Sequence, residues 1–376
     1  MKNIICCCLT ILVSNTMLYG QSLKTEVKKI ADQYKAVGVA YVVVKDGEII
    51  EKNAIGHSSV ENNTPLDADK NIFRIASISK SFTATALMQL VEKKKISLDD
   101  DFGDLVGFPV RNPKFPDTKI TLRMVLSHTS SINDANGYFE LDVINPTKNP
   151  YYHKSYNSYA PGTDYQYCNL NFNMAGAVLE RLTNVRFDTY IRQQILDPLG
   201  LYGGYCIDSM DNARFASLYS YDNKNETFVL QPLAYNPRSE EVRNYKIGES
   251  TPIFSPTGGM KISAVDLAKY MTMHMNYGKF GKVKILSKKS AKLMQSKISD
   301  KEGYGLALLE TTKLIPGQHL VGHTGSAYGL YSSMFFNPKE KYGILVITNG
   351  CVPTYKNGNV ALTAEITNLL YQRLIK

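Results

Sequence analysis

A serine and a lysine three positions apart are the first residues in this sequence that could perform chemistry together. They are Ser77 and Lys80, in the stretch FRIASISKSFTATALMQL at residues 73–90. If a helix begins near Ala76, the two side chains project from one face about a turn apart, and the amine can reach the hydroxyl. Burial of the lysine would disfavour its charge and make it a base for a serine nucleophile. From this stretch alone, the simpler interpretation is an N-cap at Ser77 and a solvated Lys80.

A second polar pair lies in a loop ahead of a predicted helix. Tyr167 and Asn169 follow the turn-forming Pro161-Gly162 and precede FNMAGAVLERLT at residues 172–183, which is typical of a helix. Tyr-x-Asn is a weak pattern, and the sequence repeats it at residues 221–223 and 355–357. The pair gains meaning only together with other motifs.

A third motif, His323-Thr324-Gly325-Ser326, comes just before an apolar strand that begins near Tyr331. Taken alone, it could be the polar edge of a strand with a glycine that allows close packing.

The elements that must position these residues are strands at both ends of the chain and helices between them. The segment GVAYVVVKDGEIIEK at 38–52 predicts a hairpin that turns at Asp46-Gly47, and residues 331–336 and 342–348 predict a second hairpin. Apolar spacing predicts helices at 263–275 and near the carboxyl end. The predicted fold is therefore α/β of the α+β type. It has one antiparallel sheet built from both chain ends, helices on its faces and a helix-rich insertion.

Composition excludes several classes of function. The 376 residues are 44% hydrophobic, which is ample for a core, and the net charge of +9 contains no basic run longer than KKK at 93–95, which DDD follows at 99–101. We predict no nucleic-acid partner. His319 and His323 are four apart, but no glutamate follows the first and Gly322 opposes a helix, so we predict no metal and no cofactor.

The amino terminus has the pattern of a secretory signal. A lysine, an apolar stretch at 4–13 and small or polar residues precede Gln21, which predicts a signal peptide at 1–20 and a periplasmic or secreted bacterial protein with no membrane span after its removal. Three cysteines leave with this segment. The remaining Cys168, Cys206 and Cys351 are too few and too odd in number for a disulfide framework.

Taken in order, the three motifs resemble those of the penicillin-recognising serine hydrolases, the superfamily of class C β-lactamases, DD-peptidases, D-aminopeptidases and related esterases. The match is to Ser77-x-x-Lys80, Tyr167-x-Asn169 and His323-Thr324-Gly325. Further segments that look like the family are LSHTS at 126–130, Pro161-Gly162, GGMKISAVDLAKYM at 258–271 and GYGL at 303–306. The resemblance implies a β-lactamase/transpeptidase-like domain over 21–376, with a sheet subdomain at about 24–75 and 255–376 and a helical insertion at about 81–254.

The resemblance also implies roles for the residues. The catalytic residues are Ser77 as nucleophile with Lys80 and Tyr167 as proton carriers, and which of the two holds the proton stays open. Asn169 orients Lys80 and hydrogen-bonds the substrate amide. The substrate pairs with the strand that bears His323, Thr324 and Gly325, and the backbone N–H groups of Ser77 and Ser326 hold the oxyanion.

Two departures from the family pattern bear on substrate choice. Class C β-lactamases usually have lysine at the position of His323, which favours peptidase and esterase relatives. Ser131 stands where the loop would more usually have glycine, so its backbone conformation is open. The Tyr-rich stretch at 149–162 either shapes the cleft or covers the helical insertion.

The predicted function is an exported serine hydrolase that forms an acyl-enzyme on Ser77. Its substrates would be D-amino acid peptides, amides or small esters, including peptidoglycan fragments, and it would bind penicillin. One alternative is a class C-like β-lactamase. A second is a non-catalytic protein that binds cell-wall peptides.

Overall fold

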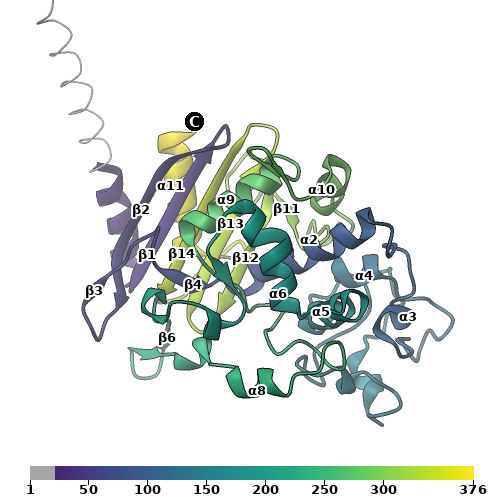
Figure 1. The fold of residues 1–376 in the computed structure, drawn as a ribbon. Helices are drawn as coiled ribbons and strands as arrows, with labels where there is room; N and C mark the ends of the chain where they lie inside the picture. Colours follow the sequence, from purple (N-terminus) through teal and green to yellow (C-terminus); the bar gives the residue numbers. More distant parts are fainter. Residues whose placement is uncertain (1–21) are drawn as a thin grey trace, which may run out of the picture.

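The structure of the protein is a computed structural model, and it describes residues 22–376 (Figure 1). The predicted signal peptide lies outside the described residues. Of the helices within 22–376, none is both long enough and apolar enough to cross a membrane.

The largest element is a seven-stranded sheet with the order β11-β12-β13-β14-β1-β2-β3. Its strands are β1 (Gly38–Lys45), β2 (Glu48–Ser59), β3 (Thr64–Pro65), β11 (Leu309–Thr311), β12 (Leu320–Ala327), β13 (Leu330–Asn337) and β14 (Tyr342–Gly350). Both predicted hairpins are confirmed, and the first turns through Asp46 and Gly47, which have positive φ angles of 53° and 93°. Because β1 pairs with β2 on one side and β14 on the other, the sheet joins the two ends of the chain as predicted.

The sheet is buried on both faces because successive side chains of its central strands point to opposite sides. In β1, Ala40 and Val42 belong to the larger apolar core, whereas Val39 and Tyr41 belong to the smaller one. Helix α9 (Ala264–Met275) packs in the larger core, and α11 (Ala361–Leu374) covers the other face with a helix that includes residues 22–33. Figure 1 shows α9 and α11 on opposite sides of the strands.

The other helices gather beside the sheet, around α2 (Ser79–Glu92). Every residue of α2 from Ser79 to Leu90 is buried, so α2 is a core helix that other parts of the protein surround on all sides. The remaining helices are α3 (Phe102–Val106), α4 (Leu122–Leu126), α5 (Asn169–Thr183), α6 (Phe187–Ile191), α7 (Asp197–Leu199), α8 (Ser239–Arg243) and α10 (Lys288–Gln295).

Short strands complete the structure. One three-stranded sheet has the order β4-β8-β5. The short strands are β4 (Ile72–Arg74), β5 (Gly203–Gly204), β6 (Tyr219–Asp222), β7 (Thr227–Leu230), β8 (Lys261–Ser263), β9 (Lys279–Phe280), β10 (Val283–Lys284), β15 (Tyr355–Lys356) and β16 (Asn359–Val360).

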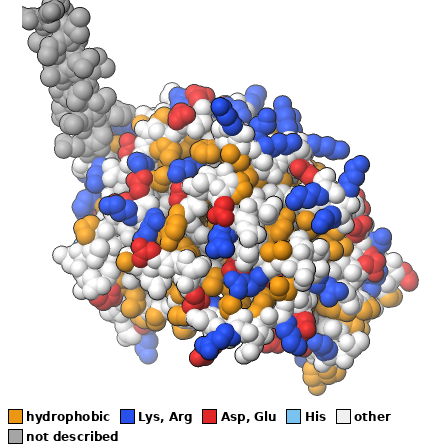
Figure 2. All heavy atoms as spheres, in the orientation of Figure 1, with side chains coloured by type: hydrophobic (Ala, Val, Ile, Leu, Met, Phe, Trp, Pro, Cys, Tyr) orange, Lys and Arg blue, Asp and Glu red, His pale blue; other side chains and the backbone are white. Residues whose placement is uncertain are grey.

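On the face shown in Figure 2, basic and acidic side chains are interspersed.

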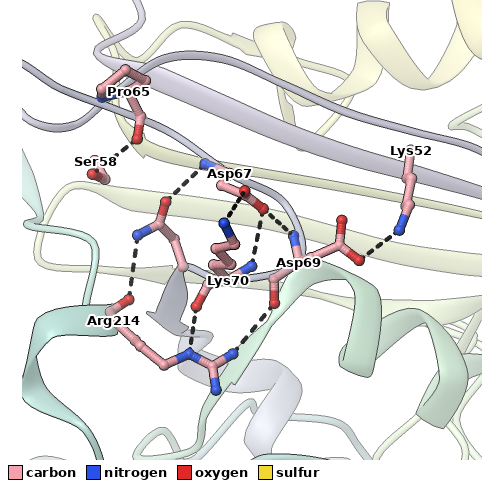
Figure 3. Close-up of polar contacts among 8 residues, drawn as sticks. Lys52, Ser58, Pro65, Asp67, Asp69, Lys70 and Arg214 are labelled. Carbon is pink, nitrogen blue, oxygen red and sulfur yellow. Dashed lines mark hydrogen bonds and ion pairs between the residues drawn. The ribbon is translucent and has the colours of Figure 1, made fainter.

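A polar network fixes the loop that leads into β4 (Figure 3). The Asp67 carboxylate accepts the backbone N–H groups of Asp69 and Lys70, at 2.9 and 3.1 Å. Arg214 donates to the Lys70 carbonyl at 2.9 Å, and Lys52 reaches Asp69 at 2.6 Å. These contacts tie the loop to β2 and to the segment around residue 214, and they hold the start of β4, which ends three residues before Ser77.

Candidate active site

Ser77 lies in a 3₁₀ turn, Ala76–Ile78, between β4 and α2. Ala76 has a positive φ angle of 50°, which for a residue with a Cβ is unfavourable by about 1–2 kcal/mol. Its backbone turns sharply there, and Ser77 stays partly exposed in a cleft while the residues on either side of it are buried. The predicted helix therefore begins slightly later than expected, after a tighter turn.

Lys80 is completely buried, and its amine faces Ser77. Its Nζ donates to Ser77 Oγ at 3.1 Å, to Asn169 Oδ1 at 3.0 Å and to the Thr257 carbonyl at 3.0 Å. Burial lowers the pKa of Lys80 to about 7, although the nearby Asp134 carboxylate opposes this shift. A large fraction of the amine is thus neutral near pH 7, and its lone pair can accept the Ser77 proton.

Tyr167 lies against the same amine. The Lys80 Nζ is 4.7 Å from the centre of the Tyr167 ring, and the phenol is a hydrogen-bond partner of Ser77. Burial raises the pKa of Tyr167 well above its usual value, and the hydrogen bond from Ser77 offsets this only in part. Because the phenol keeps its proton at neutral pH, Lys80 is the better base of the two and Tyr167 the better proton donor.

Asn169 is held by a residue that the sequence did not single out. Its Nδ2 donates to Asp134 Oδ2 at 2.9 Å, which leaves Oδ1 facing Lys80 and the Thr257 hydroxyl. Asp134 also accepts the backbone N–H groups of Asn169 and Leu170, both at 2.9 Å, at the start of α5. Asp134 therefore caps the helix and fixes the amide at once. In the sequence, the only indication of this role was the position of Asp134 two residues after the LSHTSSI segment.

His323 is neutral in its surroundings. Its Nδ1 is 2.5 Å from the Thr324 carbonyl, which can only accept, so Nδ1 carries the proton and Nε2 accepts from the Tyr304 hydroxyl at 2.9 Å. Burial and the nearby Lys80 lower the pKa of His323 to about 3. His323 thus adds no positive charge to the cleft above about pH 4.

The strand β12 lies directly beside the turn that carries Ser77. A Cβ at Gly325 would be 2.3 Å from the Ile75 carbonyl oxygen, so a glycine is required for this approach. Thr324 and Ser326 flank it, and both line the cleft with Ser77. The close packing predicted for Gly325 is therefore what allows β12 to approach the turn that carries Ser77.

The LSHTS segment lies behind Tyr167. His128 has a positive φ angle of 59° and is fully buried, and its Nδ1 accepts the Cys168 N–H at 3.2 Å. Its ring lies 4.4 Å from the Tyr167 ring and 4.8 Å from the Tyr304 ring, measured between centroids. These contacts hold the Tyr167 ring in place.

Six of the eight residues predicted from the three motifs line one cleft, and the other two, Lys80 and Gly325, lie against the turn that carries Ser77. The Tyr-x-Asn copy at 221–223, at the end of β6, does not line the cleft, whereas Asn357 of the copy at 355–357 does. The family model described as Beta-lactamase matches residues 23–367. The chain belongs to the β-lactamase family.

Known members of the β-lactamase family and its fold resemble this chain over most of its length. Protein flp of Staphylococcus aureus is 24% identical over 325 residues, which cover 83% of this chain, and the chain spans 59% of the length of that relative. The octameric penicillin-binding protein homologue from Pyrococcus abyssi superposes with a TM-score of 0.72 and 25% identity, covering 94% of this chain and 77% of that one. The D-amino acid amidase from Ochrobactrum anthropi SV3 has a TM-score of 0.70 and 19% identity, covering 94% and 99%.

The glycine that the β-lactamase family usually has after LSHTS is replaced here without loss of the turn. Ser131 adopts a positive φ angle of 65°. Its hydroxyl donates to the Tyr159 carbonyl at 2.6 Å and accepts from Asn112 at 2.9 Å. These two hydrogen bonds, worth about 1 kcal/mol each, offset the unfavourable backbone conformation.

The cleft of this β-lactamase-family chain has a volume of about 1150 Å³ and aromatic walls. No tyrosine of the stretch at 149–162 lines it, so of the two open interpretations the structure favours the one in which this stretch covers the helical insertion. The aromatic lining comes instead from Tyr138, Phe139, Tyr165, Tyr167, Tyr304, Tyr328 and Phe335. Cys168, Cys206 and Cys351 are free, buried thiols.

Proposed function

We propose that this member of the β-lactamase family is an exported, periplasmic or secreted serine hydrolase that forms an acyl-enzyme on Ser77. Family membership supports a hydrolase in general terms. The observation that carries the specific proposal is a fully buried Lys80 amine, 3.1 Å from Ser77 Oγ, with its pKa lowered to about 7.

In the proposed acylation, Ser77 Oγ attacks the substrate carbonyl carbon and its proton passes to Lys80 Nζ. The backbone N–H groups of Ser77 and Ser326 stabilise the oxyanion, a contribution of about 3–4 kcal/mol for a donor of this kind. The Tyr167 hydroxyl protonates the leaving nitrogen or oxygen and regains a proton from Lys80. Water then repeats the sequence on the ester and releases the acid and free Ser77.

The proposed substrates are D-amino acid peptides, amides and small esters. Three observations support them: the aromatic walls suit an apolar side chain, His323 supplies no charge for a β-lactam carboxylate, and one structural neighbour is a D-amino acid amidase. Because His323 supplies no charge for the penicillin carboxylate, we also expect slow acylation by penicillin and poor turnover.

The test is a labelled penicillin followed by peptide mapping. We expect one adduct, on the peptide that contains Ser77, and none in Ser77→Ala. A panel of D-Ala-D-Ala peptide, D-amino acid amide, short-chain ester and chromogenic cephalosporin then ranks the substrates. An adduct that persists in Ser77→Ala would overturn the proposal, and efficient cephalosporin turnover would favour a β-lactamase instead.

A further inference from the structure

Arg74 is a cation in the cleft that no residue of the described chain neutralises. It ends β4, three residues before Ser77, and its side chain is half-buried in the cleft wall. Its Nε donates to the Gly258 carbonyl at 3.1 Å and its Nη1 to the Ala234 carbonyl at 3.3 Å. The guanidinium lies over the Tyr328 ring, 4.8 Å from its centre. Within residues 22–376, no carboxylate forms an ion pair with Arg74.

The charged neighbours of Arg74 have the wrong sign to balance it. Burial lowers the pKa of Arg74 and the nearby Arg238 lowers it further, while burial and the nearby Arg74 lower the pKa of Lys261. The Asp134 carboxylate, which also borders the site, is engaged at the start of α5. Because arginine keeps its charge at any ordinary pH, this side of the cleft has an uncompensated positive charge. A charge that is buried without a partner is unfavourable unless a ligand supplies the opposite charge.

The position of Arg74 relative to Ser77 and β12 gives the reach of such a ligand. Tyr328, on which the guanidinium lies, follows Ser326 by two residues, whereas His323 precedes Ser326 by three. Tyr328 belongs to the turn that follows β12, so Arg74 lies beyond the Ser326 end of this strand, on the side opposite to His323. A substrate whose carbonyl sits at Ser77 can therefore place an anion at Arg74 through a short spacer.

We propose that Arg74 is the residue that binds a carboxylate of the substrate, in the place of a charge at His323. A guanidinium suits this task because its parallel N–H groups match the two oxygens of a carboxylate. The fixed contacts with two carbonyls and the Tyr328 ring hold it ready, so little freedom is lost on binding. This inference rests on the proposed acyl-enzyme function and names its substrate class: esters and amides that carry a carboxylate.

The test compares matched esters in wild type and variants. 4-Nitrophenyl acetate is neutral, mono-4-nitrophenyl glutarate carries its carboxylate on the acyl part, and 3-acetoxybenzoate carries it on the leaving part, with phenyl acetate as its neutral match. For each pair, the quantity compared is kcat/KM for the anionic ester divided by kcat/KM for the neutral ester. We expect Arg74→Gln to lower this ratio tenfold or more in one of the two pairs, mainly by raising KM for the anionic ester. The pair that responds shows whether Arg74 binds a carboxylate on the acyl part or on the leaving part of the substrate. Arg74→Lys should recover at least threefold.

Lys313→Gln is the matched control, since it removes an exposed positive charge from the rim of the same cleft. We expect it to change the ratio less than twofold because water and salt screen that charge. Ratios that Arg74→Gln leaves unchanged in both pairs overturn the proposal.

A measurement on wild type alone covers the case in which Arg74→Gln does not fold. Glutarate should inhibit hydrolysis of the neutral ester at a concentration at least tenfold lower than glutaramide, and equal inhibition by the two overturns the proposal. Loss of the Ser77 requirement for neutral ester hydrolysis would instead overturn the proposed function. Hydrolysis that depends on Ser77 but not on Arg74 would overturn the carboxylate site alone.

Discussion

Two buried lysines, Lys80 and Lys261, show how the partner of a buried amine decides whether that amine can accept a proton. Burial lowers the pKa of both. The Lys80 amine touches a hydroxyl, Ser77 Oγ, at 3.1 Å, whereas the Lys261 amine touches the Tyr205 carbonyl at 2.5 Å. A hydroxyl can give its proton to a neutral amine and a carbonyl cannot. Burial thus favours the neutral form of both amines, but only Lys80 has a partner that can transfer a proton to it.

The largest difference should appear when each lysine is replaced by methionine. We expect Lys80→Met to slow acylation of Ser77 by about 10³-fold, the usual contribution of a general base. Lys261→Met should change it less than threefold. Stopped-flow acylation with a neutral chromogenic ester measures both. Equal losses in the two variants would show that burial and not the partner makes the difference.

The pH dependence of acylation sharpens the comparison. Because Lys80 must be neutral to accept a proton and its pKa is about 7, the rate should rise tenfold per pH unit below about pH 7 and level off above it. His323, with a pKa of about 3, should not contribute between pH 5 and 9. Lys261→Met should keep the same profile. A flat profile from pH 5 to 9 in wild type would contradict Lys80 as the base.

Asp134 should act on the base as well as on the fold. Its carboxylate raises the pKa of Lys80, so Asp134→Asn should move the acid limb of the pH profile to lower pH. We also expect kcat to fall about tenfold as Asn169 loses its fixed orientation, with KM little changed. Asp164→Asn is the control, because that exposed carboxylate pairs with Lys301 on the rim. A fall in kcat without movement of the limb would leave Asp134 with a purely structural role.

The smallest effect concerns stability. Burying an amine on folding costs free energy because the amine loses its hydration. Replacing either lysine by methionine removes this cost, so both variants should have a free energy of unfolding at pH 7 that is about 1–2 kcal/mol higher than that of wild type. In wild type, the unfolded Lys80 binds more protons than the folded one between about pH 7 and its ordinary pKa of 10.5, so stability rises with pH there. Lys80→Met should lack this rise. Urea unfolding at pH 7 and 9 measures it, and a less stable Lys80→Met at pH 7 would contradict the argument.

Much of this architecture follows from local patterns in the sequence. The Asp46-Gly47 turn, the alternating strands and the helix at 264–275 all depend on interactions between near neighbours, and all were predicted correctly. The three motifs also predicted which residues meet in the cleft. Short, ordered motifs can do this because each occupies a fixed end of a strand or helix.

The supporting contacts could not be read from the sequence, because they depend on how distant loops meet. Asp134 reaches Asn169 and Tyr304 reaches His323 through tertiary packing, and neither contact leaves a periodic signal. The Tyr-rich stretch at 149–162 was equally ambiguous, since aromatic residues serve both cores and clefts. The pKa of His323 likewise required its burial to be known.

The position of β1 in the middle of the sheet has a consequence for how the protein acquires its structure. Val39 pairs with Thr348, so this one contact closes a loop that contains most of the chain. Pairings of such long sequence separation make folding slow, because the entropy of closing the loop is lost before the contacts form. While it is being synthesised, the chain cannot complete its central sheet until β14 has emerged. Until then, β1 can pair with β2 on one side, but its other edge has no strand to pair with.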